Sequence, residues 1–263
     1  LVVLLDYRSA METVDLDTAN FNSWKEALDS FGYQNLDEPT FLQDLALSTS
    51  AEVMMALCPY TTKEEWGPAL NKRDLRLARE VDDMCYANVV PVPGVTDLVT
   101  NASKHRRTTV VLLSPFREDI TRQLLQTSGL ATLVDVVVCY TALDVAVLEA
   151  LAHLKCPPPT IPEKFVSAMP EAFASPDPNF ANADIVAFVS TAMGARKMRG
   201  YGISQVGVLH NSCDQENDVN SESDDDPEVL PGRDDAASLK EAGCELVVST
   251  FKSITPEHLN LLR

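Results

Sequence analysis

The sequence predicts an α/β fold, in which a mostly parallel, Rossmann-like sheet is covered by helices on both faces. From Gly94 onward, short apolar runs of strand length alternate with amphipathic segments of helix length, the pattern of parallel strands joined by helical crossovers. The first apolar run, residues 1–5, is separated from the second, residues 109–113, by a long block with helical periodicity. We therefore expect a core formed by residues 1–14 and 91–263, with residues 15–90 inserted as a helical cap.

The block after the first strand contains the signals of several helices. Residues 38–57 predict one or two short helices. Thr62 and Glu65 match a capping box, which opens a long helix. The apolar residues of segment 17–31 recur at helical spacing and predict a helix there; they are Phe21, Trp24, Leu28 and Phe31. The long helix has a similar apolar stripe, formed by Leu70, Leu77, Val81 and Met84.

The remaining elements follow in alternation. We expect helices at 95–103, 118–127, 143–154, 183–193 and 235–242, and strands at 109–113, 134–139, 205–209 and 245–249. Gly243 stands at a C-cap position, and Thr255-Pro256 is typical of the start of a last helix. Residues 155–179 are rich in proline and predict an irregular excursion. Residues 213–235 are acidic and poor in apolar groups, which predicts a disordered insertion.

Composition limits the classes of function. The 263 residues carry a net charge of −18, which argues against a nucleic-acid partner because a phosphate backbone needs clustered lysine and arginine. No apolar stretch reaches the roughly 18 residues of a membrane-spanning helix. The six cysteines include no C-x-x-C pair, as expected of reduced thiols in an intracellular protein. The start at Leu1, without Met, fits a trimmed chain, an additional tail or a removed targeting segment. The last of these would place the protein in a plastid or mitochondrion.

Polar residues follow three of the apolar runs: Asp6, then Ser114, then His210-Asn211-Ser212. Further patterns recur between them, namely Trp24-Lys25-Glu26-Ala27-Leu28, Phe31-Gly32, Pro93-Gly94, Ser175 before Pro176-Asp177-Pro178, and Ala242-Gly243. In order and spacing these segments resemble the phosphoglucomutase-like branch of the haloacid dehalogenase superfamily of hydrolases, which carries a helical cap.

The resemblance implies a role for each matched position. In that family the first Asp, here Asp6, attacks phosphorus, and an Asp two residues later moves a proton. Magnesium is held by the first Asp, a backbone carbonyl and an Asp of the fourth motif, while a Ser or Thr and a Lys bind the phosphoryl group. In this chain Arg8 stands at the acid/base position, and Ser114 matches the Ser or Thr. Ser175 replaces the Lys, and Asn211 (or His210, if the register shifts by one) replaces the metal ligand.

These replacements predict the loss of catalysis. An arginine stays protonated and cannot relay a proton, and its fixed charge disfavours a divalent cation nearby. We therefore expect no bound metal and no meaningful phosphatase or phosphomutase turnover. For Asp6 and Arg8 the simplest structural role is an ion pair that fills the former pocket. For Ser114 it is a hydrogen bond to the start of the next helix.

Three hypotheses follow. The first is a catalytically inactive, hydrolase-like subunit that binds protein partners through residues 155–179 or 213–235. The second is a metal-independent binder of a phosphorylated metabolite, with Arg8 and Ser114 as ligands. The third is a residual hydrolase that uses Asp6 and magnesium. For the missing Lys, the sequence leaves Lys155, Lys164 and Lys197 open as substitutes.

Overall fold

The fold is built around a sheet of six parallel strands. The computed structural model describes residues 1–11, 14–29, 31–33, 36–38, 41, 50–84, 89–105, 107–139, 143–162, 173, 177, 184–209 and 235–254. The strands lie in the order β3-β2-β1-β4-β5-β6. They are β1 (Val2–Asp6), β2 (Thr109–Ser114), β3 (Val136–Cys139), β4 (Ile185–Val189), β5 (Ser204–Val208) and β6 (Leu246–Val248). The predicted α/β fold with a Rossmann-like sheet is confirmed.

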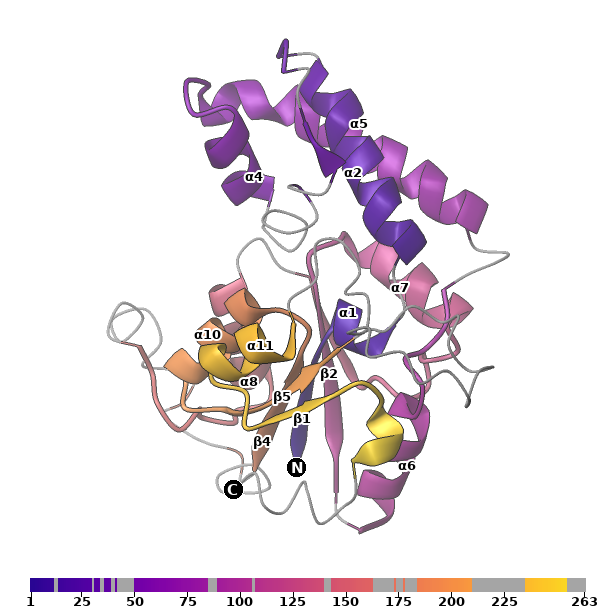
Figure 1. Ribbon diagram of the computed structural model, residues 1–263, viewed down its shortest axis with the longest axis vertical. Helices are drawn as coiled ribbons and strands as arrows, with labels where there is room; N and C mark the ends of the chain where they lie inside the picture. Colours follow the sequence, from indigo (N-terminus) through magenta and orange to yellow (C-terminus); the bar gives the residue numbers. More distant parts are fainter. Residues whose placement is uncertain are drawn as a thin grey trace, which may run out of the picture.

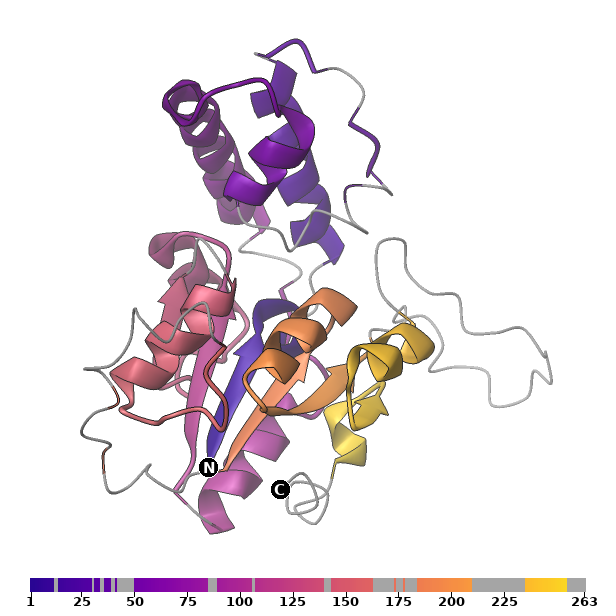
Figure 2. The ribbon, with the colours of Figure 1, turned by 90° about the vertical axis from the view of Figure 1, so that its left-hand side faces the viewer.

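Helices cover both faces of this sheet (Figures 1 and 2). Val3 and Leu5 of β1 pack into one apolar cluster, with helices α6 (Val95–His105) and α7 (Glu118–Thr127). Val2 and Leu4 pack into a second cluster on the other face. That cluster contains α8 (Leu143–His153), α10 (Ala192–Gly200) and α11 (Ala236–Ala242). A central strand must be apolar on both sides to serve two layers, which explains the unbroken apolar run at the start of the chain.

Three helices lie beyond the carboxyl ends of the strands (Figure 1). They are α2 (Val14–Asp29), α4 (Ser50–Leu57) and α5 (Lys63–Met84). Their inner faces form a third cluster that includes the buried residues Phe21, Trp24, Leu28, Val53 and Trp66. Leu16, Leu77 and Val81 instead join the cluster of the sheet, so α2 and α5 also contact the core. The division into a core and a cap at residues 15–90 stays a prediction.

Local signals in the sequence place several helix ends correctly. The carboxylate of Glu65 accepts a hydrogen bond from the Thr62 N–H (2.6 Å), as a capping box requires. Asp235 caps the N-terminus of α11, and Gly243 ends the helix with a φ of 115°, a left-handed conformation that favours glycine. No described helix is both long and apolar enough to cross a membrane. The helix predicted at Thr255-Pro256 and the acidic segment 213–234 lie outside the described residues.

One predicted element is wrong. Residues 183–193 were expected to form a helix, but they contain strand β4 and then the start of α10. All five residues of β4 are buried, and a short, fully buried apolar run cannot be assigned to helix or strand from its periodicity alone. The side chain of Thr191 accepts a hydrogen bond from the Gly194 N–H (3.1 Å) and so caps α10 immediately after the strand.

The position of β4 determines where a site can form. The chain runs outward from β1 to β2 and β3, then returns to the other side of β1 with β4. Between β1 and β4 the strand order reverses, and in open parallel sheets ligands bind at such a switch point, beyond the carboxyl ends of the strands. Asp6 at the end of β1 and Ser190 after β4 flank this point.

Gly94 is predicted to be essential for the packing of the chain end against α6. It has a φ of 89°, and a Cβ there would lie 2.5 Å from the Lys252 backbone nitrogen, in the segment of the 3-10 helix η3 (Phe251–Ser253). Gly94→Ala should therefore lower the free energy of unfolding by at least about 2 kcal/mol in urea denaturation. The control is Gly200→Ala at the exposed end of α10, where a Cβ meets nothing within 4 Å and helix propensity predicts a gain of up to about 1 kcal/mol. Equal effects of the two substitutions would contradict this assignment.

Candidate functional site

Asp6 acts as the N-cap of a one-turn helix, α1 (Tyr7–Ala10), which begins immediately after β1. Its Oδ1 accepts a hydrogen bond from the Ser9 N–H (2.6 Å). Its Oδ2 accepts one from the Ser190 N–H (2.8 Å), and the Ser190 hydroxyl lies 3.2 Å from both oxygens. Asp6 is only 6% exposed. Both carboxylate oxygens are thus engaged by groups of the protein itself.

The ionisation of Asp6 is disfavoured by its surroundings. Burial is the main cause and raises the pKa of this carboxyl, while the hydrogen bonds from Ser190 and Ser9 and the charge of Arg8 oppose the shift. An acid with a raised pKa in the folded state stabilises the fold less as pH increases, because the unfolded chain then ionises more readily.

Arg8 is paired with Asp17 of α2 and not with Asp6, so the expected Asp6–Arg8 ion pair is wrong. The Arg8 Nη2 lies 2.9 Å from the Asp17 Oδ1, and the Nε donates to the same oxygen at 3.1 Å. The side chains are 2% and 7% exposed. Burial alone would lower the pKa of Arg8, but the charge and hydrogen bonds of Asp17 and Tyr7 raise it above its ordinary value.

The reason for this choice of partner is the conformation after Asp6. In an extended chain, residues two apart point to the same side, and the predicted pairing assumed that geometry. In a helical turn, residues two apart do not face each other. Because α1 begins at Tyr7, Arg8 points toward the cap helix α2, where the Tyr7 hydroxyl also donates to Asp17 (3.3 Å).

Ser114 occupies the predicted position at the end of β2 and has the predicted local role. Its hydroxyl accepts a hydrogen bond from the Phe116 N–H (3.3 Å) and shares a second one with the Thr121 hydroxyl of α7 (2.8 Å). It is fully buried. The Ser114 hydroxyl is therefore engaged within the protein, as are the Nε and Nη2 of Arg8, and the phosphate-binding role of these two residues stays a prediction.

β4 lies beside β1, on the side opposite β2. Ser190, directly after β4, is therefore the polar residue that contacts Asp6 from the neighbouring strand end. On the sequence alone, this place beside Asp6 is predicted for Asn211, after the strand at 205–209. That strand, β5, pairs with β4 and β6 and does not pair with β1. Asn211, His210 and Ser175 lie outside the described residues. Ser190 could have been recognised from the sequence, since it follows a five-residue apolar run and precedes the helix cap Thr191.

The described residues do not fit a magnesium ion at Asp6. This cation prefers anionic oxygen ligands in near-octahedral geometry, yet both oxygens of Asp6 already accept hydrogen bonds from the protein. Ser190 offers a neutral hydroxyl. Across the part of the chain that the structure describes, no group of three or more His, Cys, Asp or Glu side chains could hold a metal ion.

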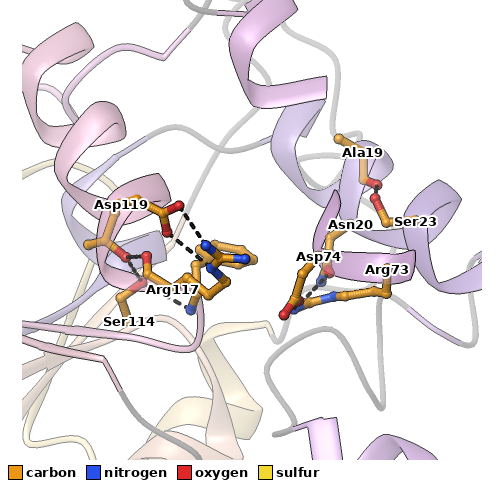
Figure 3. Close-up of polar contacts among 10 residues, drawn as sticks. Ala19, Asn20, Ser23, Arg73, Asp74, Ser114, Arg117 and Asp119 are labelled. Atoms are coloured by element: carbon orange, nitrogen blue, oxygen red, sulfur yellow. Dashed lines mark hydrogen bonds and ion pairs between the residues drawn. The ribbon is translucent and has the colours of Figure 1, made fainter. Parts of the chain in front are cut away.

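A substitute for the missing Lys is not found among the described candidates. Lys197 of α10 forms a 3.5 Å ion pair with Glu52 of the cap helix α4, and Lys155 is exposed with a φ of 50°. Lys164 lies outside the described residues. Two other cationic side chains, Arg73 and Arg117, line a cavity between α4, α5 and the loop after β2 (Figure 3), and neither was singled out from the sequence.

Comparison with known proteins identifies the fold. No protein-family model matches the sequence, and no curated protein does so significantly.

Solved structures match over almost the whole chain. A haloacid dehalogenase-like family hydrolase from Streptococcus pneumoniae has a TM-score of 0.61 at 10% identity, covering 100% of this chain and 98% of its own. CbbY from Rhodobacter sphaeroides, in complex with phosphate, has a TM-score of 0.62 at 13% identity, covering 98% of both chains. Beta-phosphoglucomutase from Clostridium difficile has a TM-score of 0.59 at 12% identity, covering 99% of this chain and 96% of its own. The chain has the haloacid dehalogenase-like fold in its phosphoglucomutase-like form, as the motifs predicted.

The Arg8–Asp17 pair is predicted to hold the cap helix to the core. Replacing either partner alone leaves a buried charge without its counterpart, which typically costs about 3–5 kcal/mol. Arg8→Met or Asp17→Leu should each lower the free energy of unfolding by that amount. The double variant should recover most of the loss, because an apolar pair of similar volume leaves no unbalanced charge. Additive losses in a urea-unfolding double-mutant cycle would show that the two residues are not coupled.

The raised pKa of Asp6 predicts a pH dependence. We compare the unfolding free energy of the wild type with that of Asp6→Asn. The stability of the wild type relative to the variant should decrease as the pH rises from about 4, the pKa of Asp in the unfolded chain, to the higher pKa of Asp6 in the folded protein. Below that window the protonated carboxyl contributes fully, and above it the burial of a charge opposes folding. Urea unfolding of both proteins between pH 4 and 7 measures this slope. A difference that increases with pH would mean that hydrogen bonding outweighs burial.

Proposed function

We propose that this chain is a catalytically inactive hydrolase-like protein that serves as a structural or interaction subunit. The observation that carries the proposal is the state of the Asp6 carboxylate. Each of its two oxygens accepts a hydrogen bond from a backbone N–H, of Ser9 or of Ser190, so the would-be nucleophile forms part of the fold's own hydrogen bonding. A phosphoryl transfer would require Asp6 to exchange these bonds for a metal ion and a phosphorus centre.

The neighbouring residues support the same conclusion. Arg8 can neither give nor take a proton near neutral pH, and its guanidinium is held by Asp17 away from Asp6. Ser190 brings no negative charge to offset a divalent cation. General acid/base help alone typically accelerates a reaction by 10²–10⁴-fold, and the metal contributes further. Losing both removes the groups that make the family's reaction fast.

The alternative roles are weaker in this geometry. A phosphate site on Arg8 and Ser114 would have to displace Asp17 and Thr121, which already satisfy them. A residual hydrolase would have to act without an acid/base at position 8. A subunit role uses features that catalysis does not need, namely the acidic segment at 213–235, the proline-rich segment at 155–179 and the net charge of −18. Protein partners with basic surfaces are the class that this charge favours.

The proposal predicts no Asp6-dependent turnover. With magnesium present, hydrolysis of sugar phosphates and of a generic aryl phosphate by the wild type should equal that by Asp6→Asn within about twofold. Asp97→Asn, an exposed carboxylate in the first turn of α6, controls for preparation-dependent activity. Turnover that is lost in Asp6→Asn and kept in Asp97→Asn would refute the inactive assignment. Elution of the native protein from cell extract at the size of its own monomer, with no larger species, would refute the subunit role.

A further inference from the structure

We infer that the ion pair between Glu52 and Lys197 is a releasable latch, which holds helix α4 over the cavity between α4, α5 and the loop after β2. Glu52 lies in the first turn of α4 and Lys197 in the last turn of α10, and the Lys197 Nζ lies 3.5 Å from the Glu52 Oε1. The pair thus joins a helix of the segment inserted after β1 to a helix that packs on the sheet. The inference does not depend on the proposed function.

Apolar packing fixes α4 to its neighbouring helices but not to the sheet. Val53 and Met54, the buried residues of α4, belong to the cluster that α2, α4 and α5 form with one another. Among the described residues, neither of the two clusters of the sheet includes a residue of α4. The position of α4 relative to the sheet therefore depends on polar contacts, and the ion pair of Glu52 with Lys197 is such a contact.

The helices α2 and α5 join the cluster of the sheet near one of their ends. Leu16 lies in the first turn of α2, and Leu77 and Val81 lie in the second half of α5. The buried Arg8–Asp17 ion pair lies at the same end of α2. With 16 and 22 residues, the two helices extend over about 24 and 33 Å, so a small rotation about this end moves α4 by a much larger distance. We therefore assign the hinge to this end.

The latch is weak enough to be released. The side chains of Glu52 and Lys197 are 39% and 21% exposed, so water and salt screen their attraction. Ion pairs of this kind shift a two-state equilibrium by at most about fivefold. The Arg8–Asp17 pair at the hinge, in contrast, is buried. A rise in ionic strength, or a charged partner that competes for Glu52 or Lys197, would release α4 and leave the hinge in place.

Two cysteines report on the latch. Cys139 is partly exposed and lines the cavity together with Ser50 and Ala51 of α4. Cys58, directly after α4, is buried in the cluster of α2, α4 and α5. A swing of the intact helices would open the cavity to a reagent at Cys139 and leave Cys58 protected. Local unfolding of the same helices would expose both thiols.

The test compares the rates at which a bulky maleimide labels these two thiols, measured at each cysteine by peptide mass spectrometry. At low ionic strength, Lys197→Gln and Glu52→Gln should each raise the rate at Cys139 by about two- to fivefold, because the rate follows the open fraction. The rate at Cys58 should stay unchanged. The double variant should label no faster than the single variants, since the pair is already broken.

A matched variant and a salt series complete the design. Lys240→Gln also removes a lysine from the last turn of a helix, the neighbouring α11, and should change neither rate. In roughly 1 M salt the wild type should label at Cys139 as fast as Lys197→Gln, because the ion pair is then screened. An equal Cys139 rate in the wild type and both single variants would overturn the latch, as would increases that add in the double variant. A parallel rise at Cys139 and Cys58 would also overturn it, because the helices would then be unfolding.

Discussion

The turn of helix that begins at Tyr7 determines the partners of both charged residues at the end of β1. Because the chain leaves the strand directly into α1, the Asp6 carboxylate lies over the N-terminus of that helix and accepts the Ser9 N–H. The same turn directs Arg8 toward α2, where Asp17 receives it. Two opposite charges that are two residues apart thus belong to different interactions. One joins the ends of β1 and β4 through Ser190, and the other joins α1 to α2.

This arrangement gives Asp6 and Arg8 structural roles. A buried carboxylate and a buried guanidinium each carry a large desolvation cost, and each is retained only with partners in good geometry. Ser190 supplies two donors to Asp6, its backbone N–H and its hydroxyl. A carboxylate at position 190 would instead repel that of Asp6, so the serine suits a buried acid at the end of β1.

A cavity of about 340 Å³ that Arg73 and Arg117 line lies apart from Asp6, Arg8, Ser114 and Ser190. The positive charges there come from the cap helix α5 and the N-cap of α7, and not from the positions that the family motifs mark. The cap and the core each contribute one guanidinium.

The sequence by itself determined the sheet, the order of most elements and the positions of Asp6, Arg8 and Ser114, because burial patterns and caps are local and periodic. It also determined the Ser114 contact to the start of α7, which spans only two residues. It failed at β4, because a five-residue apolar run has the same composition in a buried strand and in a buried helix. The tertiary structure alone decided that Ser190 meets Asp6 across 184 positions, that Asp17 receives Arg8, and that Arg73 faces Arg117. Such contacts depend on which strands become neighbours and on how the cap packs against the core, and neither is encoded in the spacing of the residues concerned.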